Sequence, residues 1–266
     1  MKPSVLITGA SSGIGAATAR RLGEAGYEVF GTSRRPEAQP SLPAVRWVSM
    51  DVRDEASVTR AVEEVLAEAK RLDALVCNAG VGLFGSVEEV PLERAEAQFE
   101  TNFFGTLRPL RAVLPHMRAG RHGRIVVVGS LAGRAPIPFS AHYSASKAAV
   151  DALVLALRSE LDGLGVHVSL VEPGDINTPF NDRMQWIDSA ASPYGERIRR
   201  VEQVVRELLP KAPGPELVAR TIERALTSRR PRVRYPVGPD SRAVPAGRRL
   251  LPDGLLLRLI RSHYGI

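Results

Sequence analysis

A tyrosine and a lysine four residues apart are the first pair in this sequence whose types and spacing suggest chemistry. Tyr143 and Lys147 frame the segment Tyr-Ser-Ala-Ser-Lys at the start of a stretch with helical periodicity. Residues four apart lie on one face of a helix, so the phenol and the ammonium can project into the same cleft. A free phenol has a pKa of about 10, and a nearby ammonium lowers that pKa by stabilising the phenolate. The pair is therefore a candidate proton donor and acceptor near neutral pH.

A glycine-rich segment supplies a candidate phosphate site. Residues 8–15 read Thr-Gly-Ala-Ser-Ser-Gly-Ile-Gly between a predicted strand and a predicted helix. Glycines let the backbone approach a pyrophosphate closely, and the helix N-terminus offers partial positive charge to the anion. A plain capped turn is the structural alternative, but the position after the first strand favours a dinucleotide site. The predicted contacts are Gly9, Ser11, Ser12, Gly13, Ile14 and Gly15.

The end of the second predicted strand indicates which dinucleotide binds. An NAD site usually has an acidic residue there, which accepts a hydrogen bond from the ribose 2′-hydroxyl. This chain has Ser33, Arg34 and Arg35 instead. A guanidinium pairs with a 2′-phosphate through charge-assisted hydrogen bonds. The predicted cofactor is therefore NADP(H), and the alternative is that both arginines are merely solvated.

Asp51 and Val52 follow the third predicted strand, at a position suited to the adenine of the cofactor. The carboxylate would accept from the exocyclic amine, and Val52 would lie against the ring. The structural alternative is that Asp51 caps a helix, although Asp54 is the better candidate for that cap.

Short β-branched runs alternate with helical stretches, a pattern typical of a parallel sheet covered on both faces. The expected strands span residues 4–8, 28–32, 45–50, 73–77, 124–129, 166–172 and 232–237. The expected helices span residues 13–26, 54–70, 92–117, 144–164 and 216–227. The predicted fold is α/β, a Rossmann-type doubly wound parallel sheet of about seven strands in a single domain, 1–266. Such a sheet binds ligands at the carboxyl ends of its strands.

Together these motifs resemble the single-domain branch of the short-chain dehydrogenase/reductase family, which has T-G-x-x-x-G-x-G and Y-x-x-x-K. The resemblance covers about residues 4–180. Further family motifs recur in order, although Cys77 precedes N-A-G where the family usually has Asn. They are Asn78-Ala79-Gly80, Asn102, Ser130, and Pro173-Gly174 followed by Thr178. Residues 171–178 and the tail resemble the hydroxysteroid and retinol dehydrogenase subgroup.

The resemblance implies a hydride transfer between a nicotinamide and a carbonyl or secondary alcohol, carried out by four residues. Tyr143 exchanges the proton, and Ser130 donates to the substrate oxygen. Lys147 lowers the phenol pKa and holds the ribose, and Asn102 keeps a water in line with Lys147. The further cofactor contacts implied are Asn78, Ala79, Gly80, Tyr143, Lys147, Pro173, Gly174, Ile176 and Thr178.

Residues near these motifs indicate the substrate. Besides Ser130 and Tyr143, the candidates are Leu131, Phe139, Phe180 and Met184, with Val81, Leu83, Phe84, Pro136 and Trp186 nearby. Most are apolar, which favours a steroid-, retinoid- or lipid-like substrate. Ordinary packing, or a small or acyl ketone, is the alternative. Residues 175–213 are expected to form the substrate loop and helices.

The net charge of +7 is concentrated near the C-terminus. Residues 197–266 contain 16 of the 36 Lys and Arg residues and 6 of the 29 Asp and Glu residues. A solvated basic face is favoured over a nucleic-acid site, because aromatic residues make up only 5% of the chain. The extension 239–266 is expected to pack on the domain or form a lid, with contact at a membrane surface as the alternative.

No apolar run approaches the ~20 residues of a membrane span, and a lone cysteine, Cys77, agrees with a reducing compartment. We expect a cytoplasmic enzyme with no metal site and no nucleic-acid partner. We also expect a homodimer or homotetramer that pairs through the helices at 92–117 and 144–164. A non-catalytic NADP-binding regulator and an epimerase are the competing functions, although the regulator predicts loss of Tyr143 or Lys147.

Overall fold

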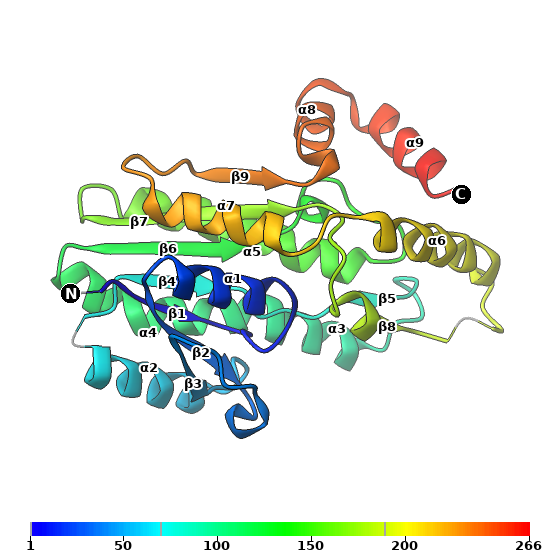
Figure 1. The fold of residues 1–266 in the computed structure, drawn as a ribbon. Helices are drawn as coiled ribbons and strands as arrows, with labels where there is room; N and C mark the ends of the chain where they lie inside the picture. Colours follow the sequence, from blue (N-terminus) through cyan, green and yellow to red (C-terminus); the bar gives the residue numbers. More distant parts are fainter. Residues whose placement is uncertain (1, 70, 189) are drawn as a thin grey trace.

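The structure, a computed structural model, describes residues 2–69, 71–188 and 190–266. At its centre is a seven-stranded sheet with the order β3-β2-β1-β4-β6-β7-β9 (Figure 1), and every neighbouring pair is parallel. The strands are β1 (Ser4–Ile7), β2 (Glu28–Ser33), β3 (Val45–Ser49), β4 (Ala74–Cys77), β6 (Gly123–Val128), β7 (Val166–Pro173) and β9 (Arg234–Val237). The strand order reverses between β1 and β4, as in a doubly wound sheet. The predicted Rossmann-type fold is confirmed.

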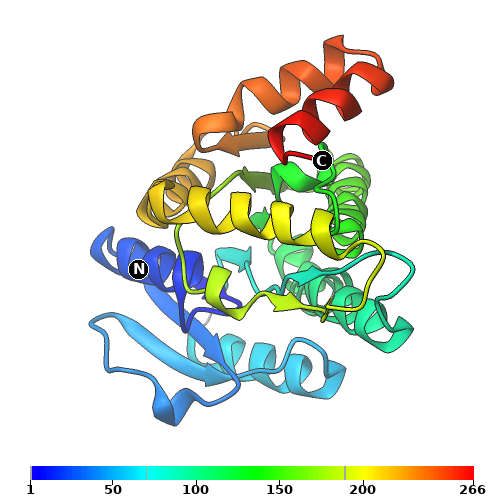
Figure 2. The ribbon, with the colours of Figure 1, turned by 90° about the vertical axis from the view of Figure 1, so that its right-hand side faces the viewer.

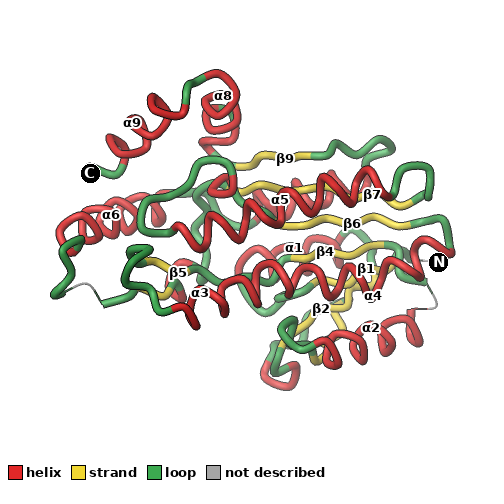
Figure 3. Tube along the Cα trace, turned by 180° about the vertical axis from the view of Figure 1, so that it is seen from behind, coloured by secondary structure: helices red, strands yellow, loops and turns green. Residues whose placement is uncertain are grey.

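Helices cover both faces of this sheet (Figure 3). On one face lie α1 (Gly13–Glu24) and α7 (Glu216–Thr227), whose apolar residues pack with those of β1. The other face is covered by α2 (Glu55–Ala69), α4 (Gly105–Ala119) and α5 (Ala141–Glu160). The sheet is thus buried on both sides, which explains why its strands are continuous apolar runs.

Strand β1 contributes side chains to the apolar cores on both faces of the sheet. Leu6 packs in the core beneath α2, α4 and α5, whereas Val5 and Ile7 pack beneath α1 and α7. Successive side chains of a strand point to opposite faces, so all three are fully buried although they are adjacent in sequence.

Four of the five expected helices differ from the sequence prediction, and the helix expected at 13–26 is α1, which ends at Glu24. The region 92–117 contains α3 (Leu92–Phe99), a π-helical turn at Glu100–Phe104 and then α4. The helix expected at 144–164 is α5, which begins at Ala141 and ends at Glu160, so Tyr143 lies in its first turn. Of the helix expected at 54–70, residues 55–69 are helical, and Lys70 lies outside the described residues.

A second, two-stranded parallel sheet was not predicted. It pairs β5 (Leu83–Phe84) with β8 (Gln185–Trp186), and the rings of Phe84 and Trp186 stack with centroids 4.2 Å apart. The pairing joins the segment after β4 to the segment after β7. Within 175–213 the structure also has α6 (Gly195–Leu208), while Ser189 lies outside the described residues.

The C-terminal extension contains α8 (Ala243–Leu250) and α9 (Asp253–His263), which lie beyond β9 at the edge of the sheet (Figure 1). Neither helix contributes a buried side chain. The end of α9 turns back toward the body, where the backbone carbonyl of Gly265 accepts from Arg200 Nη1 at 3.3 Å. In the described part of the chain, no helix has the length and apolar character needed to cross a bilayer.

The apolar residues of α5 do not form a single exposed stripe. Val150 is fully buried and Leu157 is nearly so, and both belong to the chain's own core. Leu155, in contrast, is 41% exposed. Part of the apolar surface of this helix, which we expect to pair subunits, therefore packs within the chain itself.

Candidate active site

The predicted site residues meet at the carboxyl edge of the sheet, which Figure 2 views end on. The glycine-rich turn follows β1, Asn78 follows β4, Ser130 follows β6, and Pro173 ends β7. Because β1, β4, β6 and β7 are consecutive neighbours in the sheet, their ends are brought side by side. Residues from four distant parts of the sequence thus form one site.

The glycine-rich turn requires its glycines for two reasons. Gly9 and Gly13 have φ values of +64° and +54°, in the left-handed region that favours glycine. A Cβ on Gly15 would collide with the carbonyl oxygen of Gly9 and would lie 2.6 Å from Nδ2 of Asn78. The turn is therefore built around closely approaching backbone.

Asn78 ties this turn to the end of β4. Its Nδ2 donates to the carbonyl oxygens of Thr8 and Gly9 at 3.0 and 3.1 Å. The Thr8 hydroxyl in turn accepts from the backbone amides of Asn78 and Ala79 at 2.9 and 3.1 Å. The N-A-G motif thus fixes the shape of the glycine turn.

The residues at this turn fit a dinucleotide. Ser12 is the N-cap of α1, its side chain makes no capping hydrogen bond, and the first turn of α1 has no acidic residue. A helix N-terminus left open in this way attracts a phosphate. Thr178 lies directly over the turn, because a Cβ on Gly13 would be 3.4 Å from the Thr178 Cβ.

Arg34 and Arg35 are both exposed just past the end of β2. The backbone amide of Arg35 donates to the Ser33 hydroxyl at 3.1 Å, which shapes the chain at this point. The positive charge of Arg34 contributes to the lowered pKa of Asp51 on the neighbouring strand end. Two exposed guanidinium groups therefore lie at the position where the sequence predicts a 2′-phosphate.

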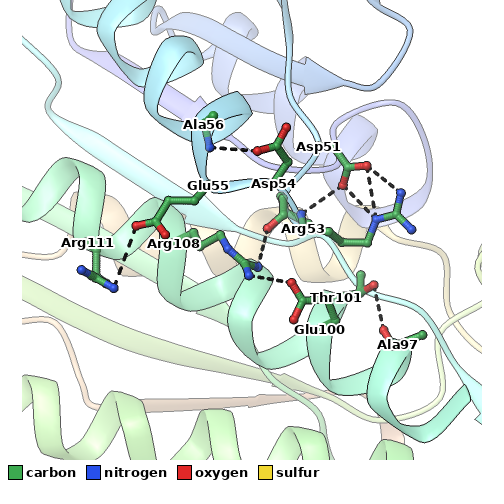
Figure 4. A network of polar contacts seen from close by, with 11 residues as sticks. Asp51, Arg53, Asp54, Glu55, Ala56, Ala97, Glu100, Thr101, Arg108 and Arg111 are labelled. Atoms are coloured by element: carbon green, nitrogen blue, oxygen red, sulfur yellow. Dashed lines mark hydrogen bonds and ion pairs between the residues drawn. The ribbon is translucent and has the colours of Figure 1, made fainter. Parts of the chain in front are cut away.

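The Asp51 carboxylate is already paired within the chain (Figure 4). It accepts from Arg53 Nη2 at 2.6 Å and from the Arg53 backbone amide at 3.0 Å, and this pairing is the main cause of its lowered pKa. Asp54, not Asp51, caps α2 by accepting from the Ala56 amide at 2.9 Å. The expectation that Asp54 is the better cap is confirmed.

Val52 is largely buried at the end of β3. Only 8% of it is exposed, and a Cβ on Gly105 would lie 2.7 Å from its side chain. Its carbonyl oxygen accepts from Arg108 Nη1 at 3.1 Å, and Arg108 also pairs with Glu100 (Figure 4). These contacts attach the end of β3 to the start of α4.

Tyr143 and Lys147 lie together as their spacing predicts, with the lysine Nζ 5.9 Å from the centre of the phenol ring. Lys147 is 6% exposed, and its Nζ donates to the Val128 carbonyl at 3.0 Å. Burial lowers the pKa of Lys147 to about 8. Burial also raises the pKa of Tyr143, while its interaction with the Ser130 hydroxyl acts in the opposite direction. The protein groups alone therefore do not acidify the phenol.

Asn102 is completely buried in the π-helical turn. Its Oδ1 accepts from the Val81 amide at 2.9 Å, and its Nδ2 donates to Ser146 Oγ at 3.1 Å. Lys147 and Asn102 approach each other across Gly80, where a Cβ would be 3.3 Å from Asn102 Oδ1 and 3.7 Å from Lys147 Nζ. A π-helical turn is a common feature of functional sites.

Ser146 is a linking residue that our sequence reasoning missed. Its hydroxyl donates to the Tyr143 carbonyl at 2.7 Å and accepts from Asn102. It thus joins the first turn of α5 to the π-helical turn. Its position three residues after Tyr143, on the same helical face, was the available signal.

One of the predicted substrate residues, Phe180, lies beside the Tyr143 ring, and Met184 and Phe139 have other neighbours. Phe180 lies with its ring centre 6.2 Å from that of Tyr143. Phe180 and Met184 both pack over Gly82, where a Cβ would meet each of them at 3.1 Å. Phe139 has a φ of +59° and contacts Tyr194, with ring centres 6.2 Å apart. Leu131, in contrast, is buried beneath Gly174, and Leu83 and Phe84 are buried in β5.

A buried ionic cluster behind the site was also missed. Glu172 has no exposed surface and accepts from Arg134 Nε and Nη2 at 2.6 and 2.9 Å. It also accepts from Arg234 at 2.7 Å, and Arg234 pairs with Asp151 of α5. The cluster joins the turn after Ser130 to the end of β7, which carries Pro173. Nothing in the sequence pattern distinguishes these charges from surface charges.

Comparisons with known proteins agree with this geometry. The family model for short chain dehydrogenases matches residues 3–186. The 3-ketodihydrosphingosine reductase of Bacteroides thetaiotaomicron is 36% identical over 270 residues, which cover 100% of both chains. The estradiol 17-beta-dehydrogenase 1 of Rattus norvegicus is 35% identical over 87% of this chain and 72% of its own length.

Solved structures give the same result. A short-chain dehydrogenase from Streptomyces avermitilis superposes with a TM-score of 0.84 at 31% identity, covering 100% of this chain and 98% of that one. A short-chain dehydrogenase from Burkholderia cenocepacia in complex with NADP has a TM-score of 0.79 at 28% identity and covers 97% of each chain. A 3-ketoacyl-(acyl-carrier-protein) reductase from Brucella melitensis, complexed with NADH, has a TM-score of 0.74 at 26% identity and covers 88% and 95%. The motifs, the sheet and these relatives together establish that the chain is an enzyme of the short-chain dehydrogenase/reductase family of oxidoreductases.

Proposed function

We propose that this enzyme uses NADP(H) to interconvert a ketone and a secondary alcohol on an apolar, lipid-like molecule. The observation that carries the proposal is the position of Tyr143, which lies beside Lys147 at the carboxyl edge of the sheet and against the Phe180 ring. A phenol in that place can exchange a proton with a substrate whose apolar part contacts aromatic side chains.

Each polar residue has a role that follows from its contacts. Tyr143 donates the proton to the carbonyl oxygen in reduction, and Ser130 stabilises the negative charge that develops on that oxygen. Lys147, with a pKa of about 8, accepts or releases a proton near neutral pH. Asn102 positions Ser146 and through it the start of α5. A bound nicotinamide supplies or accepts the hydride, and its positive oxidised form favours the phenolate.

The preference for NADP(H) rests on Arg34 and Arg35. Their exposed guanidinium groups lie just past β2, and the neighbouring carboxylate of Asp51 is neutralised by Arg53. A 2′-phosphate would therefore meet two cations. One similar structure is in complex with NADP and another with NADH. The cofactor preference of this chain is therefore tested directly.

The substrate class is supported by the residues around Tyr143. Phe180 lies beside the proton donor, Met184 packs with Phe180 over Gly82, and all of these groups are apolar or aromatic. One relative is a reductase of 3-ketodihydrosphingosine and another a dehydrogenase of estradiol, and both names denote lipophilic molecules. We favour such a molecule over a small polar ketone.

The function is tested by measuring NADPH consumption against long-chain 3-keto compounds, steroid ketones, retinal, β-ketoacyl esters and simple aldehydes. We expect turnover with an apolar ketone and a loss of about 10²- to 10⁴-fold in kcat for Tyr143→Phe. Tyr27→Phe, at the amino end of β2, is the matched control and should retain full activity. Full activity in Tyr143→Phe would overturn the assignment of the proton donor.

The cofactor preference is tested with the double variant Arg34→Ala, Arg35→Ala. We expect the wild type to bind NADPH more tightly than NADH, and the variant to lose most of that difference, because charged hydrogen bonds contribute about 1.5–3 kcal/mol each. Wild-type protein that binds NADH as tightly as NADPH would contradict the proposal.

A further inference from the structure

The side chain of Arg183 reaches the N-terminus of α1. Arg183 ends a short 3-10 turn, Asn181–Arg183, in the segment that follows Thr178. Its Nη1 donates to the Ser12 hydroxyl at 3.1 Å, a contact between residues 171 positions apart. Ser12 is the N-cap of α1. Arg183 lies outside all of the motifs recognised in the sequence.

A cation is out of place at this position. The N-terminus of a helix carries a partial positive charge, so an arginine side chain there is electrostatically unfavourable. The first turn of α1 has no acidic residue that would offset the charge. Among the residues that the structure describes, no carboxylate forms an ion pair with Arg183. The Arg183 guanidinium and the N-terminus of α1 therefore both place positive charge beside Ser12. An anion between them would be stabilised by both.

The chain holds Arg183 over the glycine turn. Thr178 packs against Gly13, and Asn181 donates from its backbone amide to the Thr178 carbonyl at 3.0 Å. The Asn181 side chain also donates to the Ile176 carbonyl at 2.9 Å, and Ile176 is buried. These contacts fold residues 174–183 into a strap across the turn, so the approach of Arg183 follows from the backbone path.

We propose that Arg183 binds the pyrophosphate of the dinucleotide, opposite the backbone amides of the glycine turn. This inference rests on the proposed function, since it assigns a further residue to the same cofactor site. Arg183 would exchange its hydrogen bond with Ser12 for a charge-assisted one with a phosphate oxygen. Binding of cofactor is thereby coupled to the position of the strap, which also carries Phe180 beside Tyr143.

The test compares dissociation constants for NADPH and NADH, measured by quenching of protein fluorescence. The two cofactors share the pyrophosphate and differ in the 2′-phosphate. Arg183→Ala should therefore weaken both by a similar factor, about tenfold, as expected for one charged hydrogen bond. Arg34→Ala with Arg35→Ala should weaken NADPH alone. Arg183→Lys should recover part of the affinity, because it keeps the charge without the planar donor pair.

Controls separate this inference from the proposed function. Arg206→Ala removes another exposed arginine, which pairs with Glu202 on α6, and should leave both constants unchanged. Since Arg183 is exposed, its variants should fold, and Arg183→Gln provides a second neutral side chain. Unchanged affinity for both cofactors in Arg183→Ala and Arg183→Gln would overturn the inference alone. A selective loss of NADPH affinity would also overturn it, because Arg183 would then read the 2′-phosphate. Wild-type protein that binds neither cofactor would overturn the proposed function itself.

Discussion

At the scale of single residues, burial shifts the pKa values of Lys147 and Tyr143 in opposite directions. Lys147 is nearly inaccessible to water, which lowers its pKa to about 8, and burial raises the pKa of Tyr143. The sequence predicted the proximity of the two side chains but not these shifts, because four-residue spacing does not reveal depth. Acidification of the phenol therefore stays a prediction for the state with a positively charged nicotinamide beside it.

Replacing Lys147 by methionine should stabilise the fold while abolishing activity. An unfolded lysine has a pKa of about 10.4, so between about pH 8 and pH 10 the unfolded chain binds more protons and the wild type gains stability as pH rises. At pH 7 the charged amine carries its full burial cost, roughly 3 kcal/mol for this shift. Lys147→Met should thus raise the free energy of unfolding most at pH 7, and less at pH 9.5.

Denaturant titrations at these two pH values check this expectation. Lys211→Met, which changes an exposed lysine, is the control and should alter stability little at either pH. A stabilisation by Lys147→Met of equal size at both pH values would show that the charge is not its cause.

Gly15→Ala should destabilise the protein, because the new Cβ would collide with the Gly9 carbonyl and the Asn78 amide. Both atoms are fixed by the hydrogen bonds of the turn. We expect a cost of about 1–3 kcal/mol. In Gly254→Ala, the control, a Cβ meets nothing within 4 Å and lies within α9, so that variant should unfold at the same or a slightly higher temperature. Equal melting temperatures for Gly15→Ala and wild type would contradict the steric argument.

At the scale of secondary structure elements, the sequence predicted those strands and helices whose limits depend on residues nearby in the chain. The seven strands of the main sheet lie within two residues of their predicted limits, since most contain short runs of β-branched or apolar residues between turns. Strands β5 and β8 escaped prediction because each has two residues and its partner lies about a hundred residues away. Helix α5 begins three residues before its predicted start, after Ser140, a favoured N-cap residue that the prediction overlooked and whose hydroxyl donates to the Leu83 carbonyl instead of capping the helix.

The same reasoning explains what was predicted of the candidate site. Residues at strand ends, such as Asn78 and Ser130, follow from the motifs and the parallel topology. Contacts between distant segments, such as those of Glu172 and Arg183, depend on packing and have no signature in the sequence, whereas Ser146 could have been found from its spacing to Tyr143. Of the candidate substrate residues, Phe180 lies beside Tyr143, whereas Leu131 packs beneath Gly174.

Glu172→Gln should destabilise the protein strongly. The change leaves Arg134 and Arg234 without the buried carboxylate that both of them contact. Breaking a buried ion pair from one side costs about 3–5 kcal/mol. Glu202→Gln is the control, since it removes an ion pair from the surface of α6, and it should cost less than about 1 kcal/mol. Urea denaturation of the two variants and wild type provides the comparison, and similar losses for both would refute a special role of the cluster.

At the scale of the whole molecule, the two ends of the chain differ in how they pack against the main sheet. Strand β1 is central to the sheet, whereas α8 and α9 form an appendage with exposed leucines, of which Leu250 is 75% exposed. The end of the appendage returns to the body of the molecule, where Tyr264 is half-buried. Burial, and next the negative charges of Asp175 and Asp240, raise the pKa of Tyr264. Whether the extension packs on the domain or acts as a lid therefore stays a prediction.

Deletion of residues 251–266 should leave the main fold intact. Because α9 contributes no buried side chain, we expect the melting temperature to fall by only a few degrees. The deletion uncovers Asp175, which follows Gly174 in the strap, so we expect a higher KM for an apolar ketone. Thermal unfolding and steady-state kinetics measure the two effects. Loss of cooperative unfolding would mean that the tail is part of the main folding unit.

The docking of Tyr264 beside Asp175 also bears on how the protein is best prepared. An affinity tag or fluorescent fusion joined after Ile266 would begin three residues after Tyr264 and crowd that contact. Strand β1 starts at Ser4, and the N-terminus lies on the opposite side of the molecule from the C-terminus (Figure 1). Purification handles and surface-immobilisation linkers therefore belong at the N-terminus.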